Sequence, residues 1–433
     1  MTIKHPLRVA LVVPHVFMGD ELREQVIFSP GELAREFANA DWGDILASCG
    51  VFVGIASEGA KISLTLFTPL PVKCKAPTVV ADYSGFEREL AGRGYGYLEL
   101  LKKHPSLFVA LSRQLQGEII ASAFARANAG EFDLVHIYTN EEDQALIFAD
   151  LCRVPVVFTH HDPYNFLIKY KSVFPQYRGR NFVSMSLAQQ RTAPEGTNFV
   201  ANIYHGVRLS APVANCRPEG TNTGRLAPLL AEQSSANSPR SAFGAMNSHG
   251  AKNTTPYFIY VGRIIEPKGV HLAIAAAERA GVNLKIVGKR YDDNYFEREI
   301  ATHLEGTGGA SRKKGGKIEY LGFKRGEALQ TLVAGARGLL MPSQFEEPFG
   351  MTAIEALAVG TPVIASRNGA LPEIIEEGKS GFFADSVDEM AAKMAKIDEI
   401  RPENCVKRVK EQFSLEKMLA EHAKLWLKLA KKS

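Results

Sequence analysis

Short apolar runs alternate with amphipathic segments through the first half of the chain. Runs rich in Val, Ile and Leu without polar alternation are typical of strands buried on both faces of a parallel sheet. The first run, Arg8–Val13, stops at Pro14, and a helix start follows at Ser29, with an N-cap serine, a proline and a capping glutamate. The pattern predicts further strands over Ile62–Phe67, Asp133–Tyr138, Val154–Thr159, Asn181–Ser186 and Asn198–Ile203, and helices over Tyr97–Asn128 and Glu141–Leu151.

The pattern is interrupted between Ser210 and Thr255. This segment is rich in Ser, Asn, Gly, Ala and Pro and has no apolar period. Such a composition cannot bury enough apolar surface to offset the entropy of ordering the chain. It predicts a flexible interdomain linker over 210–255; an ordered surface loop is the alternative.

Strand and helix patterns alternate again after the linker. A strand, Tyr257–Val261, is followed by a helix over Pro267–Ala280, and the chain ends in a helix, Ser414–Lys432, with one apolar stripe that needs a partner surface. Alternating strands and helices predict α/β domains with parallel sheets, here two units across a cleft. Further strands are predicted over Leu284–Val287, Ile318–Leu321, Gly338–Met341 and Pro362–Ala365.

The composition excludes several classes of protein but does not identify the function. A chain of 433 residues is too long for one ordinary core. Lys and Arg exceed Asp and Glu by 51 − 47 = 4, which suits an anionic ligand or membrane surface but does not indicate nucleic acid. The five scattered cysteines form no CxxC pair, and no apolar stretch is long enough to cross a bilayer. We therefore expect a cytoplasmic protein without a metal site, with peripheral contact to the membrane left open.

A first candidate site lies in the block Tyr260–Gly269. A buried strand ends at Gly262, Arg263 follows at once, and Lys268 stands at the start of a helix. Glycine lets a ligand approach the backbone, while Arg, Lys and a helix N-terminus all suit phosphate oxygens. The combination indicates a diphosphate site; the alternative is a pair of solvated loop charges after a strand.

A second candidate site carries two glutamates separated by seven residues. Glu347 lies in a loop after a strand, a helix begins near Gly350, and Glu355 lies two turns into that helix among apolar residues. An acid in such a helix is costly unless it has a partner, and the hydroxyls of a sugar or ribose would provide one. The alternative is a capping carboxylate together with a core salt bridge.

These motifs together resemble family 4 of the retaining glycosyltransferases. The resemblance rests on GR-x4-KG from Gly262, on the glutamate pair followed by AxxxGTPVIAS, and on the segment Gly369–Phe382. It is strongest over Tyr257–Asp385. It implies the GT-B fold: an acceptor-binding Rossmann-like domain over 1–209 completed by a returning C-terminal helix, 414–433, and a donor-binding one over 256–413. Weaker landmarks in the first half are Thr159–Asp162, Phe182–Ser186 and Ile203–Val207.

The resemblance also implies roles for the charged residues of the second half. Arg263 and Lys268 would neutralise the donor diphosphate, which is an electrostatic role that needs no metal. Glu347 would hold the hydroxyls of the donor sugar, and Glu355 would bind the ribose. Such enzymes move a hexose from a UDP-, GDP- or ADP-linked donor to a glycan, lipid or small molecule, without a resident cofactor and with retention of configuration. The departing phosphate would help to deprotonate the acceptor.

Further roles follow from the same resemblance for backbone groups and for the first domain. Backbone atoms of Phe349, Gly350 and Met351 would contact the sugar and phosphate. Gly19, in the first loop, would approach the diphosphate, and His160, at the end of a strand, would lie near the reacting sugar.

Two other interpretations stay open at the level of sequence. The family usually has a Gly-Gly pair in the first loop, where this chain has Met18-Gly19-Asp20. That departure favours a non-catalytic sugar-nucleotide-binding protein with a degenerate first domain as an alternative. A second alternative is a GT-B enzyme that epimerises a sugar nucleotide. Adjacent histidines, His160 and His161, point apart on a strand, so they are a poor metal site.

Overall fold

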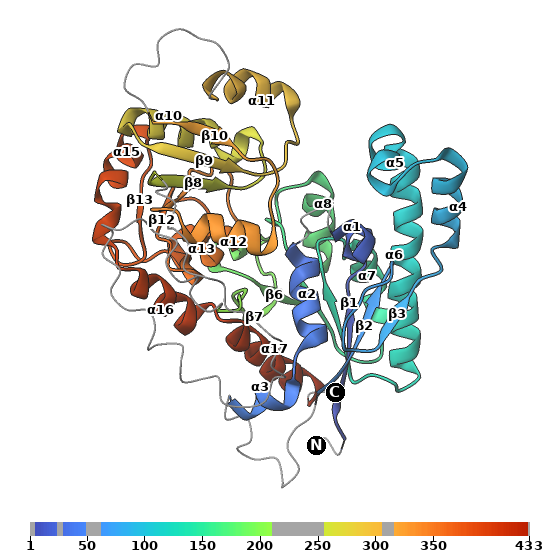
Figure 1. Ribbon diagram of the computed structural model, residues 1–433. Coiled ribbons are helices and arrows are strands. Elements are labelled where there is room, and N and C mark those ends of the chain that lie inside the picture. The colour runs from blue at the N-terminus through green and yellow to red at the C-terminus, as the bar shows by residue number, and fades with distance from the viewer. Residues whose placement is uncertain (1–4, 24–28, 49–61, 210–254, 305–315, 432–433) are drawn as a thin grey trace, which may run out of the picture. The chain divides into compact units, whose positions relative to one another are not determined.

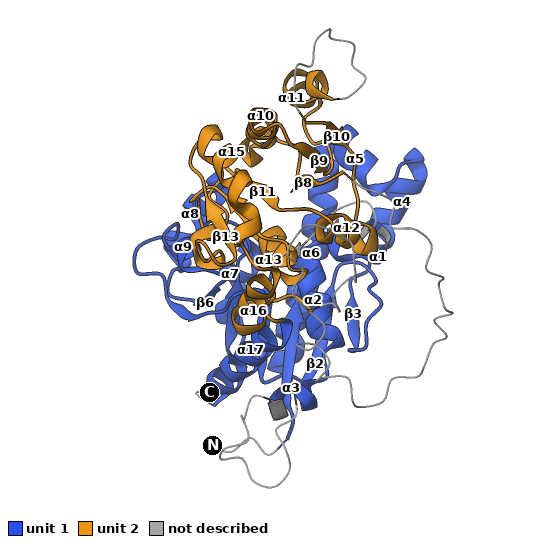
Figure 2. Cartoon of the chain, turned by 60° about the vertical axis from the view of Figure 1, so that its left-hand side comes forward, with its two compact units in different colours: residues 1–205, 415–433 blue, residues 206–414 orange. Residues whose placement is uncertain are grey.

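The structure is a computed structural model that describes residues 5–23, 29–48, 62–209, 255–304 and 316–431. The chain divides into two compact units, unit 1 (residues 1–205 and 415–433) and unit 2 (residues 206–414), which Figure 2 colours separately. The predicted linker, 210–255, lies outside the described residues except for its last position.

Unit 1 is built on a seven-stranded parallel sheet with the order β3-β2-β1-β4-β5-β6-β7 (Figure 1). The first strand lies in the interior: Val9 is beside Leu64 of β2 on one side and Leu134 of β4 on the other. The strand order changes direction between β1 and β4. The strands are β1 Leu7–Val12, β2 Ile62–Thr68, β3 Thr78–Val80, β4 Leu134–Tyr138, β5 Val156–Thr159, β6 Asn181–Ser184 and β7 Phe199–Asn202.

The long helix predicted over residues 97–128 is wrong as a single helix. The structure breaks it at His104 into α5 (Tyr97–Lys103) and α6 (Pro105–Asn128), because Pro105 cannot donate the backbone bond that a continuous helix requires. The remaining helices of unit 1 are η1 Val16–Met18, α1 Asp20–Arg23, α2 Ser29–Asn39, α3 Trp42–Ser48, α4 Ser84–Arg93, α7 Asp143–Phe148, η2 Ala149–Leu151, α8 Ile168–Tyr177, α9 Leu187–Gln190 and α17 Leu415–Ala430.

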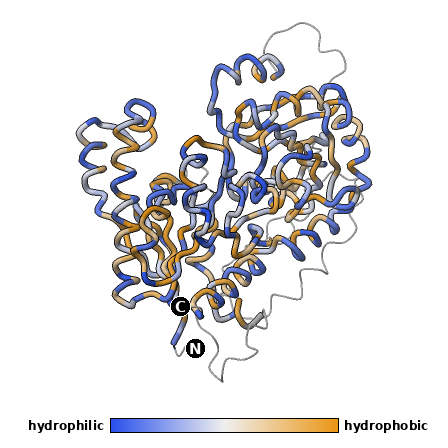
Figure 3. The backbone as a smooth tube through the Cα atoms, turned by 180° about the vertical axis from the view of Figure 1, so that it is seen from behind, coloured by the Kyte–Doolittle hydropathy of each residue, from blue (hydrophilic) through white to orange (hydrophobic). Residues whose placement is uncertain are grey.

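The C-terminal helix α17 belongs to unit 1, as predicted. Trp426 at its centre is fully buried, contacts the rings of Phe37 and Trp42, and donates its indole N–H to His136 Nδ1 at 3.1 Å. The whole predicted stripe is buried, so this helix closes one side of the sheet. Figure 3 shows hydrophilic and hydrophobic residues alternating along the outer helices, as expected for helices that bury one side. The buried stripe residues of α17 are Leu415, Met418, Leu419, Leu425, Trp426 and Leu429.

Unit 2 contains a six-stranded parallel sheet with the order β10-β9-β8-β11-β12-β13. Leu339 of β11 lies between Ile259 of β8 and Val363 of β12. The order changes direction between β8 and β11. The strands are β8 Tyr257–Val261, β9 Asn283–Val287, β10 Ile318–Tyr320, β11 Leu339–Met341, β12 Val363–Ala365 and β13 Gly381–Phe383.

The helices of unit 2 cover its sheet in pairs: α10 packs against α15, and α13 packs against α16. No helix among the described residues of either unit is both long enough and apolar enough to span a bilayer. The helices are η4 Glu266–Lys268, α10 Val270–Ala280, α11 Asp293–Glu299, η5 Ala301–His303, α12 Gly326–Ala334, α13 Met351–Ala358, α14 Leu371–Ile374, α15 Val387–Lys396, η6 Ile397–Glu399 and α16 Pro402–Gln412.

Candidate functional site

The predicted site residues of unit 2 gather where its strand order changes direction. In open parallel sheets, ligands bind outside the carboxyl ends of the strands at this switch point. The loop after β8 carries Arg263 and Lys268, and the loop after β11 carries Glu347. The two loops are joined by a hydrogen bond from Gln344 N to Pro267 O at 2.8 Å. Two sequence blocks far apart in the chain therefore form one surface.

Lys268 and Glu347 form an ion pair at this surface. The Lys268 ammonium donates to Glu347 Oε1, which also accepts a hydrogen bond from Ser343 Oγ at 2.9 Å. The ammonium lies 5.0 Å from the centre of the Phe345 ring. Both charged side chains are largely buried, at 17% and 7% exposed for Lys268 and Glu347. Each charge is thus compensated by the other, since a buried charge is stable only when paired.

The main chain at Glu347 is held by the loop that follows β12. A Cβ on Gly369, which has φ +58°, would lie 2.2 Å from Glu347 O, so the two backbones are in direct contact. Ala370 N donates to Glu347 O at 2.8 Å, and Asn368 Nδ2 donates to Ser343 O at 2.6 Å. The sequence motifs include Gly369 but give no indication of a role for Ser343 and Asn368. Both are ordinary loop residues, and only the meeting of the β11 and β12 loops gives them a role.

Arg263 is exposed, unlike Lys268. Among the described residues its guanidinium has no ion-pair partner, whereas its carbonyl accepts a hydrogen bond from Tyr260 Oη at 3.1 Å. Burial raises the pKa of the Tyr260 hydroxyl well above its usual range, so this group stays a donor at every physiological pH. A Cβ on Gly262 would lie 3.0 Å from Tyr260 Oη. Close packing on this tyrosine is therefore one reason for the glycine, besides the approach of a ligand predicted for it.

Gly269→Ala should destabilise unit 2 by more than the about 1–3 kcal/mol that a left-handed residue costs alone. Gly269 has φ +72°, and a Cβ there would lie 2.0 Å from Pro342 O, at the base of the Glu347 loop. Gly322→Ala is the matched control, because Gly322 has φ +70° but nothing within 4 Å of its Cβ position. Denaturant unfolding of both variants measures the difference. Equal losses of stability would contradict a clash at Pro342.

The helix α13 begins directly after the Glu347 loop. Gly350 is its N-cap, with φ 114°, and Met351 is its first residue. The first N–H groups of a helix have no partner within the helix and favour an anion. Phe349 is buried and its ring contacts Phe413, with ring centroids 6.0 Å apart. Contact of these three backbones with sugar and phosphate stays a prediction.

Glu355 projects from the second turn of α13. Its side chain is exposed to solvent, yet desolvation raises the pKa of its carboxyl to about 7. A carboxylate is stabilised by water beyond its first layer as well as by the water that it touches. The side chain can therefore touch solvent while the surrounding protein still weakens its hydration. Water screens part of this penalty at an exposed group. The raised pKa of about 7 places the titration of Glu355 near neutral pH.

The two predicted site residues of unit 1 are both buried. His160, at the end of β5, is 0% exposed; its Nδ1 forms an ion pair with the carboxylate of Glu142, and its ring packs on Tyr164 and Tyr170. His160 is thus buried in this conformation, and its contact with the reacting sugar stays a prediction. Successive side chains at a strand end point to opposite faces. The adjacent His161 accordingly lies on the other side and is 8% exposed.

Gly19 lies in a packed turn. It is buried after η1, and a Cβ on it would lie 2.8 Å from Leu70 Cβ. Packing is therefore a sufficient reason for glycine here, and its approach to a diphosphate stays a prediction. Within the described residues, no group of three or more His, Cys, Asp or Glu side chains could hold a metal ion.

Comparison with known sequences finds similarity over the part of the chain that carries this site. Residues 244–412 match the family described as Glycosyl transferases group 1. An uncharacterized glycosyltransferase of Methanocaldococcus jannaschii is 34% identical over 140 residues, which are 31% of this chain and 33% of that protein. A glycogen synthase of Xanthomonas oryzae is 30% identical over 192 residues, 43% of this chain and 33% of that protein. The matches thus span about a third of these two relatives.

Two solved structures extend the similarity over the whole chain at low sequence identity. HepE of Anabaena, solved with UDP and glucose, has a TM-score of 0.62 at 15% identity, covering 98% of this chain and 100% of that one. A sucrose-phosphate synthase of Thermosynechococcus elongatus has a TM-score of 0.62 at 16% identity, covering 99% and 100%. Together with the two parallel sheets, these similarities confirm the predicted GT-B fold.

Proposed function

We propose that this chain, which carries a glycosyl transferases group 1 domain over residues 244–412, is a retaining glycosyltransferase that moves a hexose from a nucleotide-diphosphate sugar to an acceptor. The observation that carries the proposal is the Lys268–Glu347 ion pair at the switch point of the unit 2 sheet. Arg263 and the N-terminus of α13 complete the donor site, and Glu355 lies further along the same helix.

The ion pair suggests how the donor enters. A diphosphate would take over Lys268, because two phosphate charges attract an ammonium more strongly than one carboxylate does. Glu347 would then be released to accept hydrogen bonds from the sugar hydroxyls, with Ser343 still holding Oε1. Lys268 and Glu347 would therefore pair with each other before the donor binds. In the complex, Lys268 would bind the diphosphate of the donor and Glu347 its sugar.

The transfer step would then be driven by electrostatics. Negative charge grows on the β-phosphate as the bond to the sugar breaks, and fixed cations and helix N–H groups stabilise that charge. Lys268 and Arg263 supply the cations, and the start of α13 supplies the N–H groups. We propose that the acceptor attacks from the side of the leaving phosphate, which takes the acceptor proton, so that the configuration is retained without a covalent enzyme intermediate and without a metal.

Nucleotide binding and turnover of the purified protein test the proposal directly. UDP is the first nucleotide to use, because HepE was solved with it, and GDP and ADP complete the panel. A nucleotide that binds the folded state must raise the melting temperature. The corresponding nucleotide hexoses are then incubated with glycans, lipids and small molecules as acceptors, and release of the diphosphate nucleotide is followed. Proton NMR of the product gives the anomeric configuration.

The rival functions give different outcomes. Stabilisation by a nucleotide without release of its diphosphate form, with any acceptor, would indicate the sugar-nucleotide-binding protein. A changed sugar still attached to the nucleotide would indicate the epimerase. Transfer with inverted configuration would leave a glycosyltransferase but contradict the front-face mechanism. We place the enzyme in the cytoplasm, where nucleotide sugars are available to it, with unit 1 receiving the acceptor.

Binding of UDP should weaken as pH falls below 7. The ribose hydroxyls would donate to the ionised carboxylate of Glu355, so binding favours that form and competes with its protonation. With a pKa of about 7 in the free protein, the affinity should fall by up to about tenfold per pH unit below that value and level off above it. Titration calorimetry at several pH values measures the profile. Glu355→Gln should flatten it, and an unchanged profile in that variant would exclude Glu355 from the ribose site.

A further inference from the structure

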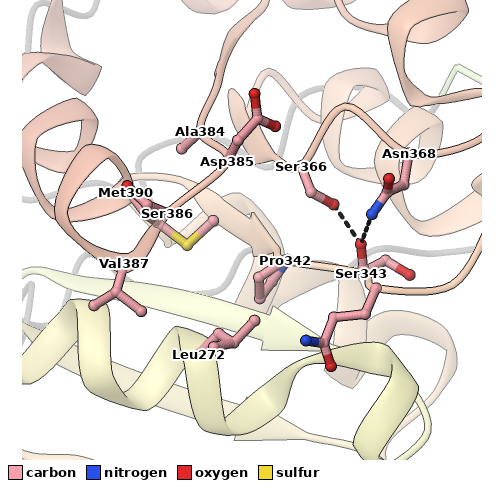
Figure 4. A pocket seen from close by; sticks show the side chains of 11 residues that line it. Leu272, Pro342, Ser343, Ser366, Asn368, Ala384, Asp385, Ser386, Val387 and Met390 are labelled. Atoms are coloured by element: carbon pink, nitrogen blue, oxygen red, sulfur yellow. Dashed lines mark hydrogen bonds between the residues drawn. The ribbon is translucent and has the colours of Figure 1, made fainter.

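A pocket of unit 2 lies beside the proposed donor site and shares Ser343 with it. The mechanism above gives the pocket itself no role. It has a volume of about 380 Å³, within the range of small-molecule sites. Its walls come from α10, the loops that follow β11, β12 and β13, and the start of α15. Figure 4 shows Leu272 of α10 and Val387 and Met390 of α15 around it, with Ser366, Asn368 and Asp385 on the loops.

The lining of this pocket combines an apolar side with neutral hydrogen-bonding groups. Leu272, Val387 and Met390 provide the apolar side. Among the described residues that line it, none is Lys, Arg or His, and the carboxylate of Asp385 is the one charge. Arg367, between the lining residues Ser366 and Asn368, is already paired with Asp385 at 3.5 Å, so a phosphate or carboxylate ligand would have to compete with that pair. The lining therefore favours a ligand that is uncharged and has both apolar and hydroxyl faces.

Several polar groups of the pocket have unused hydrogen-bonding capacity. Asn368 donates its Nδ2 to Ser343 O, and no described residue donates to its Oδ1. Ser386 Oγ accepts from Glu389 N at 3.2 Å, which leaves its proton available. The side-chain amide of Gln344 has no hydrogen-bond partner within the described residues, and Gln344 lines the same pocket. Donors and acceptors thus stand on several sides of one space, matching a ring whose hydroxyls both donate and accept.

The pocket is connected to the donor site through Ser343. The carbonyl of this residue accepts from Asn368 Nδ2 at 2.6 Å and from Ser366 Oγ at 2.5 Å, as the dashed lines in Figure 4 mark. Its hydroxyl donates to Glu347 Oε1. A ligand that binds Asn368 is therefore connected through one residue, Ser343, to the Glu347 carboxylate, which we assign to the donor sugar.

We propose that this pocket binds a neutral sugar unit, separate from the nucleotide-linked sugar, and that its occupancy alters the donor site through Ser343. The unit is a free monosaccharide or one residue of a longer glycan, which offer the same hydroxyls and apolar ring face. Because a coupling between two sites is reciprocal, the sugar and the nucleotide must then change each other's affinity by the same factor.

Saturation-transfer NMR with the full chain tests the pocket. Glucose, mannose and galactose are offered with and without their methyl glycosides, always with saturating UDP so that the donor site is filled. Val387→Trp places an indole in the pocket, and Asp388→Trp, at the next and exposed position, is the matched control. Binding with a dissociation constant on the order of millimolar is expected. It should weaken by about tenfold or more in Val387→Trp, and not in Asp388→Trp.

The outcomes separate this proposal from the proposed function. Equal sugar signals from wild type and Val387→Trp, or no signal from any sugar at concentrations on the order of 10 mM, would overturn it while leaving donor binding intact. Methyl glycosides that bind as well as free sugars indicate a residue within a glycan; loss of their binding indicates a free monosaccharide. The affinity for UDP should change by about fivefold or more with sugar in wild type and not in Val387→Trp. Sugar binding without that change would overturn the coupling through Ser343.

Discussion

Lys268→Met should lower the rate of glycosyl transfer by about 10²–10³-fold, which corresponds to about 3–4 kcal/mol of lost transition-state stabilisation. Two effects act together. The variant removes a cation that faces the growing charge of the leaving phosphate, and it leaves Glu347 as a largely buried carboxylate that still accepts a hydrogen bond from Ser343 Oγ. The second effect should also lower stability, because an unpaired buried charge is costly. Steady-state kinetics with the nucleotide sugar found by the binding panel measure the loss.

Lys393→Met is the matched control. Lys393 lies on α15 in unit 2 and pairs with Glu377 at 3.1 Å, but this is a surface ion pair, which is worth little. Lys393→Met should therefore keep the rate of glycosyl transfer within about twofold of the wild-type rate. Combining Lys268→Met with Glu347→Gln tests the pair as a unit: the double variant should recover stability relative to Lys268→Met but not activity. A fully active Lys268→Met enzyme would contradict the assignment of the donor diphosphate to this site.

Unit 1 should lose stability steeply as the pH falls from 6.5 to about 4. Four fully buried or nearly buried imidazoles lie together there: His136, His161, His205 and His422. The rings of His136 and His422 have centroids 5.6 Å apart, and those of His161 and His205 are 5.1 Å apart. Burial lowers the pKa of His422 to about 4 and that of His205 to about 3, and lowers those of the other two well below the usual range.

The direction of the effect follows from proton counting. Between the folded pKa and the unfolded value of about 6.5, the unfolded chain binds more protons than the folded one, so stability rises with pH. For His422 alone the full difference is about 3 kcal/mol, present above pH 6.5 and lost as the pH falls to 4. The hydrogen bonds of His136 show why the folded state disfavours a charged imidazole. Its Nδ1 accepts the indole N–H of Trp426 and its Nε2 donates to Thr159 Oγ1, so a second proton would face a donor.

His422→Phe tests this expectation. The imidazole lies edge-on to Phe37, with ring centroids 4.8 Å apart, and its Nδ1 donates to Met418 O, so a phenyl ring loses one hydrogen bond but not the packing. Denaturant unfolding at several pH values should show a shallower pH dependence between 6.5 and 4 in this variant. His303→Gln replaces a half-exposed histidine of unit 2, which pairs with Glu278, and should leave the slope for unit 1 unchanged. Parallel pH profiles for wild type and His422→Phe would exclude the buried imidazoles as the cause.

The sequence predicts the strands around both switch points, because buried parallel strands such as β1 and β8 are continuous apolar runs. It does not indicate β13, whose three residues Gly381–Phe383 carry no periodicity that separates them from a loop. Lys268 and Glu347 could be predicted because a cation at a helix start and two glutamates separated by seven residues stand in recognisable motifs. Asn368 could not, since its role depends on two loops meeting. The burial of His160 beside Glu142 could not be predicted either, because sequence alone does not fix the side to which each of two adjacent histidines points.

The return of α17 to unit 1 has a consequence for how the protein is made. Unit 1 is discontinuous in sequence: its sheet is translated first, all of unit 2 follows, and only then does the helix carrying Trp426 emerge. A nascent chain therefore holds an incomplete first domain, with the ring face of Phe37 and His136 uncovered, throughout synthesis of the second. Domains that need such distant contacts fold late and depend on protection of their apolar surface meanwhile. Stalled or prematurely terminated chains should accordingly be clients of holding chaperones, even when they contain every residue of the donor site.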